Sequence, residues 1–79
     1  MSQNNEMTVE GSVEHSKMGL GAWALVTPEG QTYEIYQQNA PEGLLKANQR
    51  VKATGQVRQD VMTIAMIGPI FEVFDFELV

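Results

Sequence analysis

The chain has 79 residues, a formal net charge of −5 and 43% hydrophobic residues. That length allows one domain, and the composition is that of a globular protein. There is no cysteine, which excludes disulfides and thiolate chemistry. The negative charge argues against a polyanionic ligand, although a local basic patch can outweigh the total.

The first residues, 1–6, are polar and lack the apolar segment of a secretory signal. We expect a disordered tail over 1–6 and a single domain over 7–79. No apolar run approaches the ~18 residues that cross a membrane. The prediction is therefore a cytoplasmic protein without membrane contact, although a leader could have been removed.

Three strands are predicted in the first half of the chain. The first, Met7–His15, contains Val9, Gly11 and Val13 on one parity. The second and third, at about 22–27 and 32–37, flank the Pro28–Gln31 turn and form a hairpin. Alternation of apolar and polar residues is typical of strands with one buried face.

Residues 39–47 interrupt the strands, and Pro41 and Glu42 suit the first turn of a short helix. The fourth strand, at about 50–59, alternates strictly and carries Gly55 at its centre. A glycine inside a strand marks a bend or a close approach of another backbone. The pattern around Gly55 matches the one around Gly11.

The stretch 60–69 is almost entirely apolar, and periodicity does not decide between strand and helix. We expect a short helical turn or irregular lid over one barrel end, with some of Met62, Ile64, Met66 and Ile67 buried. Met18, Met62 and Met66 could instead line an adaptable apolar groove, but burial in the core is the preferred interpretation. The last strand, 70–78, is apolar on both parities. It is either buried on both sides or twisted so that its faces switch.

The repeated V-x-G pattern, the hairpin turn at Gly30 and the insert 41–47 resemble the OB-fold, and in particular small bacterial OB-fold proteins of unknown function. The resemblance implies an all-β, five-stranded Greek-key barrel with one short helix between strands three and four. It implies no activity. An SH3-like small barrel is the alternative.

The predicted core gathers the inward parity of these strands. Its members are Val13, Trp23, Leu25, Tyr33, Ile35, Val51 and Val57.

The sequence offers no convincing catalytic or metal-binding set. His15 is the single histidine, and alternation turns Ser12 and Glu14 away from it. Glu72 has the opposite parity to Asp75 and Glu77, so no three-carboxylate cluster is expected. We therefore predict no enzymatic activity, no metal and no cofactor.

Basic residues concentrate on the fourth strand, where Arg50, Lys52 and Arg58 share the outward parity. They could form a stripe that binds a polyanion. In an OB barrel the fourth strand lies beside the first, whose outward residues include Glu10 and Glu14. Cross-strand ion pairs are thus the preferred interpretation.

The sequence predicts a protein-binding or assembly module, with an oligonucleotide-binding OB-fold as the alternative. OB-folds that hold single strands use a basic, aromatic face on strands two and three. Here that face carries only one aromatic residue and no basic one. It suits a protein partner or self-association better than nucleic acid, and the partner's identity is beyond the sequence. Its predicted members are Ala24, Val26, Thr32, Glu34 and Tyr36.

Overall fold

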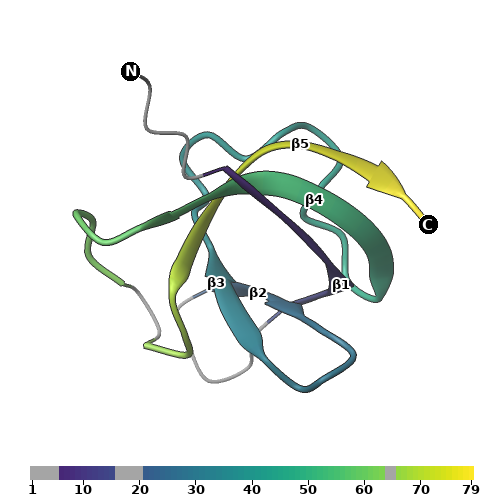
Figure 1. Ribbon diagram of the computed structural model, residues 1–79, viewed down its shortest axis with the longest axis horizontal. Coiled ribbons are helices and arrows are strands. Elements are labelled where there is room, and N and C mark those ends of the chain that lie inside the picture. The colour runs from purple at the N-terminus through teal and green to yellow at the C-terminus, as the bar shows by residue number, and fades with distance from the viewer. Residues whose placement is uncertain (1–5, 16–20, 64–65) are drawn as a thin grey trace.

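The computed structural model describes residues 6–15, 21–63 and 66–79, and five strands form one sheet (Figure 1). The strands are β1 (Met7–His15), β2 (Trp23–Val26), β3 (Thr32–Ile35), β4 (Gln49–Arg58) and β5 (Ile70–Leu78). The sheet closes on itself in the order β1-β2-β3-β5-β4, with β4 beside β1. The all-β prediction is confirmed, and the first and last strands in the sequence, β1 and β5, have the predicted limits.

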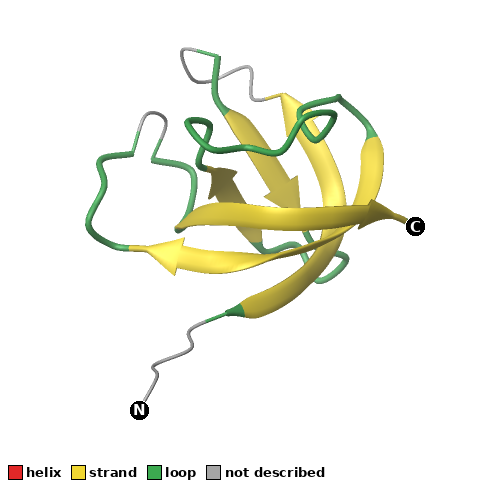
Figure 2. Cartoon of the chain, turned by 90° about the horizontal axis from the view of Figure 1, so that it is seen from above, coloured by secondary structure: helices red, strands yellow, loops and turns green. Residues whose placement is uncertain are grey.

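Strand β1 joins the two sides of this closed sheet (Figure 2). Its first seven residues pair antiparallel with β4, and its last four pair antiparallel with β2. On the other side, β5 runs antiparallel to β4 along nearly its whole length. Strand β5 meets β3 in parallel at only two register positions, Glu34 with Ile70 and Ile35 with Phe71.

The glycines inside β1 and β4 lie where two strands come very close. A Cβ added at Gly11 would collide with the carbonyl group of Val26, and one at Gly55 would collide with the carbonyl group of Glu72. The prediction of a close backbone approach is confirmed at both positions. These glycines let strongly bent strands pass each other closely in a small closed sheet.

A β-bulge explains why β5 is apolar on both parities. Thr54 pairs with Asp75 but Gly55 pairs with Val73, so Phe74 is an extra residue in β5. A bulge of this kind switches which side of the sheet the following residues face. Phe71 and Val73 are therefore inward before the bulge, whereas Phe76 packs against the core after it. Both predicted alternatives therefore hold in part, because residues 70–73 are buried on both sides and the faces switch at the bulge.

The core lies inside the closed sheet. Its buried members include five of the seven predicted residues, Val13, Leu25, Tyr33, Ile35 and Val51. Trp23 and Val57 are only partly buried and pack against this cluster. Additional core residues are Val9, Leu44, Ala53, Phe71 and Val73.

The predicted helix between the third and fourth strands is wrong. All of residues 36–48 are described, and they form turns. Gly43 has φ 88° and Asn48 has φ 67°, and neither value is compatible with a right-handed helix. The insert instead folds into a turn in which the Leu44 amide donates to the Pro41 carbonyl, 3.1 Å away. This turn delivers Leu44 into the core, where it is fully buried.

In the part of the chain that the structure describes, no helix is long and apolar enough to cross a membrane. The predicted tail over 1–6 lies outside the described residues except for Glu6, which is exposed.

Candidate protein-binding surface

The outer face of β3 is covered by the segment that follows β4. The Glu34 amide donates a hydrogen bond to the Pro69 carbonyl, 2.8 Å away, and the Thr63 hydroxyl donates to the Glu34 carboxylate. A Cβ added at Gly68 would collide with the carbonyl group of Thr32. Gly68 and Pro69 therefore continue the parallel pairing of β5 along the edge of β3, and Thr63 binds the Glu34 side chain on the outer side. We call residues 61–63 and 66–69 the covering segment.

This covering segment overturns part of the predicted surface. Ala24 and Glu34 are buried, with exposed fractions of 6% and 3%, so the predicted exposure of these two residues is wrong. Val26, Thr32 and Tyr36 are half-buried. Alternation had placed all five on the outside of the sheet, and there Thr63 of the covering segment binds Glu34.

The covering segment presents two methionines to solvent. Met62 is 91% exposed and Met66 is 83% exposed. The prediction that such residues would be buried is wrong for both, whereas Ile67 is half-buried and Ile64 lies outside the described residues. The segment has no helical turn among its described residues and is irregular. Its Thr63, Gly68 and Pro69 lie against β3.

Met66 has a backbone conformation that is unfavourable for a residue with a side chain, and a hydrogen bond supports it. Its φ is 54°, in the left-handed region that costs a non-glycine residue about 1 kcal/mol or more. The Met66 amide donates to the Thr63 hydroxyl oxygen, 2.7 Å away. The same hydroxyl donates to Glu34, so one threonine fixes both the local turn and its attachment to β3.

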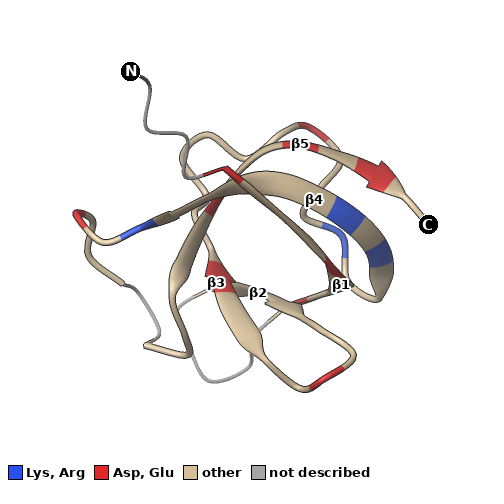
Figure 3. Ribbon diagram, in the orientation of Figure 1, with Lys and Arg blue, Asp and Glu red and all other residues tan. Residues whose placement is uncertain are grey.

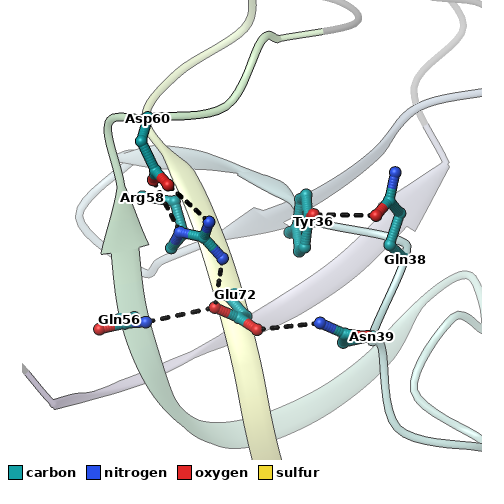
Figure 4. A network of polar contacts seen from close by, with 7 residues as sticks. All are labelled: Tyr36, Gln38, Asn39, Gln56, Arg58, Asp60 and Glu72. Atoms are coloured by element: carbon teal, nitrogen blue, oxygen red, sulfur yellow. Dashed lines mark hydrogen bonds and ion pairs between the residues drawn. The ribbon is translucent and has the colours of Figure 1, made fainter.

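A second attachment lies at the start of the segment, where Arg58 joins three elements (Figure 4). Its guanidinium donates to both carboxylate oxygens of Asp60, at 2.8 and 2.7 Å, and to Glu72 on β5 at 2.9 Å. It also lies over the ring of Tyr36, 5.4 Å from the centroid, in a cation–π arrangement. We call these four residues the Arg58 network.

Glu72 is the least exposed member of the Arg58 network. Its side chain is 11% exposed, and it also accepts hydrogen bonds from Gln56 and Asn39, each at 3.2 Å. The hydrogen bond from Arg58, helped by those from Gln56 and Asn39, lowers the pKa of Glu72 against the opposing effect of burial. Glu72 is therefore an ionised, satisfied carboxylate whose arrangement is structural.

The carboxyl group of Asp60 is more exposed but equally bound to the guanidinium. Its hydrogen bonds from Arg58 lower its pKa to about 2. The two carboxylates together raise the pKa of Arg58, with Asp60 contributing most. Tyr36 extends the arrangement outward, because its hydroxyl donates to the Gln38 side chain at 3.0 Å.

The predicted basic stripe is divided between two places on β4 (Figure 3). Arg50 and Lys52 lie near one end, whereas Arg58 lies at the other end and is neutralised by its two carboxylates. Lys52 is paired in register with Glu10 on β1 and Glu77 on β5. Arg50 approaches Glu10 at 4.0 Å. The predicted cross-strand pairing with Glu10 is confirmed.

The other chemical candidates have ordinary surroundings. His15 packs its ring on its cross-strand neighbour Trp23, with centroids 4.7 Å apart. The bulge places Glu72, Asp75 and Glu77 on one face, which corrects the predicted parity. Even so, the described residues contain no group of three or more histidine, cysteine or acidic side chains that could hold a metal ion.

Sequence reasoning preferred core burial for Met62 and Met66 over an apolar binding groove, and it missed the Arg58 network. An arginine two residues before an aspartate at the end of a strand was a visible signal for the Arg58–Asp60 pair. Nothing local pointed to Glu72 or Tyr36, because both contacts depend on how distant strands meet.

Comparison with known proteins gives this chain no relative. No protein-family model matches it, and no curated protein or solved structure is significantly similar to it.

Proposed function

We propose that this chain is a non-enzymatic protein-binding module whose contact surface is centred on Met62 and Met66. The observation that carries the proposal is the exposure of both side chains on a segment that contacts β3 through Thr63 and Pro69. Methionine is apolar and adaptable, so it loses little by packing into a partner's irregular apolar surface. Two large apolar side chains exposed on one short segment could together form such a contact.

The fixed position of the segment supports the same proposal. A binding loop that is already ordered loses less conformational entropy when a partner docks. Here the Thr63 hydroxyl and the Arg58 network restrain the segment on both sides of Met62. Tyr36 contacts Arg58 and remains half-exposed, so it extends the surface toward β3.

We also propose that the closed sheet is an OB-like barrel, an inference supported by the pairing of β4 with β1 and the hairpin of β2 with β3. In this case the covering segment occupies the face that such barrels use for single strands. The oligonucleotide alternative has little support, because carboxylates flank both Lys52 and Arg58.

The test is affinity capture from native lysate with purified bait, followed by mass spectrometry, with and without nuclease. Met62→Glu/Met66→Glu should lose the captured protein, because two charges would enter an apolar contact. The matched control, Pro28→Glu/Ala47→Glu, adds the same charge at exposed positions outside the segment. The identified partner is then titrated against all three proteins by calorimetry.

Three results would contradict the proposal: equal capture by both double variants, capture that depends on nucleic acid, or equal calorimetric affinities. A fluorescent single-stranded DNA and RNA titration provides the direct check of the alternative. Salt-sensitive binding lost on charge reversal of Arg50 and Lys52 would favour oligonucleotide binding.

A further inference from the structure

One edge of β5 has backbone groups with no partner strand. Strand β4 covers the other edge as far as Leu78, but β3 reaches only Ile70 and Phe71. The Tyr36 amide, just after β3, adds one more bond to this edge by donating to the Phe71 carbonyl, 2.9 Å away. No further backbone hydrogen bond to this edge is found among the described residues. We call the stretch 75–78 along this edge the free edge of β5.

The direction of the peptide groups follows from the end of the strand. The Val79 amide donates to the Arg50 carbonyl on β4, 3.2 Å away, so it points toward β4. Peptide groups alternate in direction along an extended strand. Those of Leu78 and Phe76 therefore point away from β4, toward the free edge, where an added strand would find them.

The side chains along this edge are exposed and of two kinds. Phe74, Leu78 and Val79 are 48%, 65% and 63% exposed. Asp75 and Glu77 are also exposed, and in the described part of the chain neither makes an ion pair within 4 Å. Asp75 and Glu77 line a hollow of about 200 Å³, whose other lining residues are Thr8, Lys52, Thr54 and Phe76. An exposed edge of this kind is a template for another strand.

The negative charges of Asp75 and Glu77 favour some added strands over others at this edge. A second copy that pairs antiparallel around Asp75, Phe76 or Glu77 would set acidic side chains directly opposite each other. Like charges at opposite positions destabilise a strand pair. A strand with basic residues at alternate positions places opposite charges there instead.

We propose that the free edge of β5 binds an extended segment of a partner protein that carries lysine or arginine at alternate positions. The segment adds as a strand: its backbone bonds Phe76 and Leu78, its basic side chains meet Asp75 and Glu77, and its apolar side chains lie against Leu78. This site is separate from the methionine surface and does not depend on it.

The probe is a short blocked peptide of alternating lysine and valine, fluorescently labelled and titrated at low and physiological salt. A glutamate–valine peptide and a lysine–valine peptide with methylated backbone nitrogens serve as controls. Wild type should bind only the unmethylated basic peptide, and binding should weaken with salt. Asp75→Lys/Glu77→Lys should reverse the preference between the two charged peptides.

Leu78→Pro tests the backbone contact, because its missing amide faces the free edge and leaves pairing with β4 intact. It should weaken binding about threefold to tenfold, the effect of one lost hydrogen bond. Leu78→Ala is the matched control that keeps the amide. Met62→Glu/Met66→Glu should bind the peptide as wild type does. If Leu78→Pro lowers the melting temperature, the methylated peptide and the charge-reversed variant still decide the question.

The proposal is overturned if wild type binds both charged peptides equally or neither, or if backbone methylation has no effect. It is also overturned if sedimentation shows a dimer of wild type that Leu78→Pro dissociates, because a second copy would then occupy the edge.

Discussion

Alternation along the strands predicted which residues are buried both on β1 and β4 and on β3. The prediction is right for β1 and β4 and wrong for the outer face of β3. Along β1 and β4 the alternating apolar residues are buried, and Arg50 and Lys52 face solvent beside Glu10. On β3 the residue predicted to be outward, Glu34, is buried beneath the covering segment. Alternation predicts which side of a strand faces the core, but it contains no information about what covers the other side.

The largest loss of stability should come from truncating a core side chain that the sequence prediction did not include. Phe71 is fully buried, so Phe71→Ala should lower the free energy of unfolding by about 3–5 kcal/mol and leave little folded protein. Trp23 was predicted from the sequence to lie in the core, where Trp23→Ala would have a similar effect. Trp23 is partly exposed, so its truncation should cost less than that of Phe71. Urea denaturation of both variants measures the order, and a larger loss for Trp23→Ala would contradict the core assignment.

The close approach at Gly55 is the next test. A methyl group there would meet the Glu72 carbonyl, so Gly55→Ala should cost about 1–3 kcal/mol through forced separation of β4 and β5. Thr54→Ala, one residue away on the outer face, is the control. Thermal melts of the two variants compare them directly. Equal melting temperatures would show that the strands do not approach closely at this point.

The Arg58 network should make stability depend on pH in the acid range. Asp60 has its pKa lowered from 3.8 to about 2 by Arg58, and that of Glu72 is lowered for the same main reason. A carboxyl group with a lowered pKa stabilises the fold above its unfolded value, and this contribution is lost as the pH falls through the folded value. For Asp60 the loss should occur between about pH 4 and about pH 2.

Asp60→Asn isolates this contribution. The difference in free energy of unfolding between wild type and the variant should be full at neutral pH and shrink as the pH falls toward about 2. Urea titrations at a series of pH values measure it. A difference that stays constant across the series would show that the ion pair with Arg58 does not form in solution.

The smallest effect belongs to the surface pair of β1 and β4. Arg50 and Glu10 are about half-exposed and 4.0 Å apart. Arg50→Ala should therefore change the free energy of unfolding by less than about 1 kcal/mol. A matched Arg58→Ala variant should be clearly less stable, because it leaves the carboxylate of buried Glu72 without its charged partner. If the two variants melt at the same temperature, Arg58 stabilises the fold no more than the exposed Arg50 does.

Much of the fold could be predicted because it depends on local patterns. The limits of β1 follow from alternation, those of β5 from a continuous apolar run after Gly68 and Pro69, and the close approaches at Gly11 and Gly55 from the lack of a side chain. The insert could not be predicted in the same way. Pro41 and Glu42 resemble a helix start, but Gly43 takes a positive φ and ends the turn at once.

The candidate site was less accessible to sequence reasoning. Apolar content alone predicted that Met62 and Met66 would be buried, yet neighbouring Thr63, Gly68 and Pro69 make the contacts to β3 while the methionines face solvent. Which residues of an apolar segment are buried depends on the surface it meets. That surface includes Glu34, whose role depends on a hydroxyl 29 positions away in the sequence.

The central claim is that the covering segment is fixed on β3 and so presents its methionines in place. Amide hydrogen exchange of Met66 tests it most directly, because that amide lies within the covering segment and donates to the Thr63 hydroxyl oxygen. We predict measurable protection of the Met66 amide in wild type and its loss in Thr63→Val, with Thr8→Val unchanged. Exchange of Met66 in wild type as fast as that of Glu29 in the exposed turn would contradict the account.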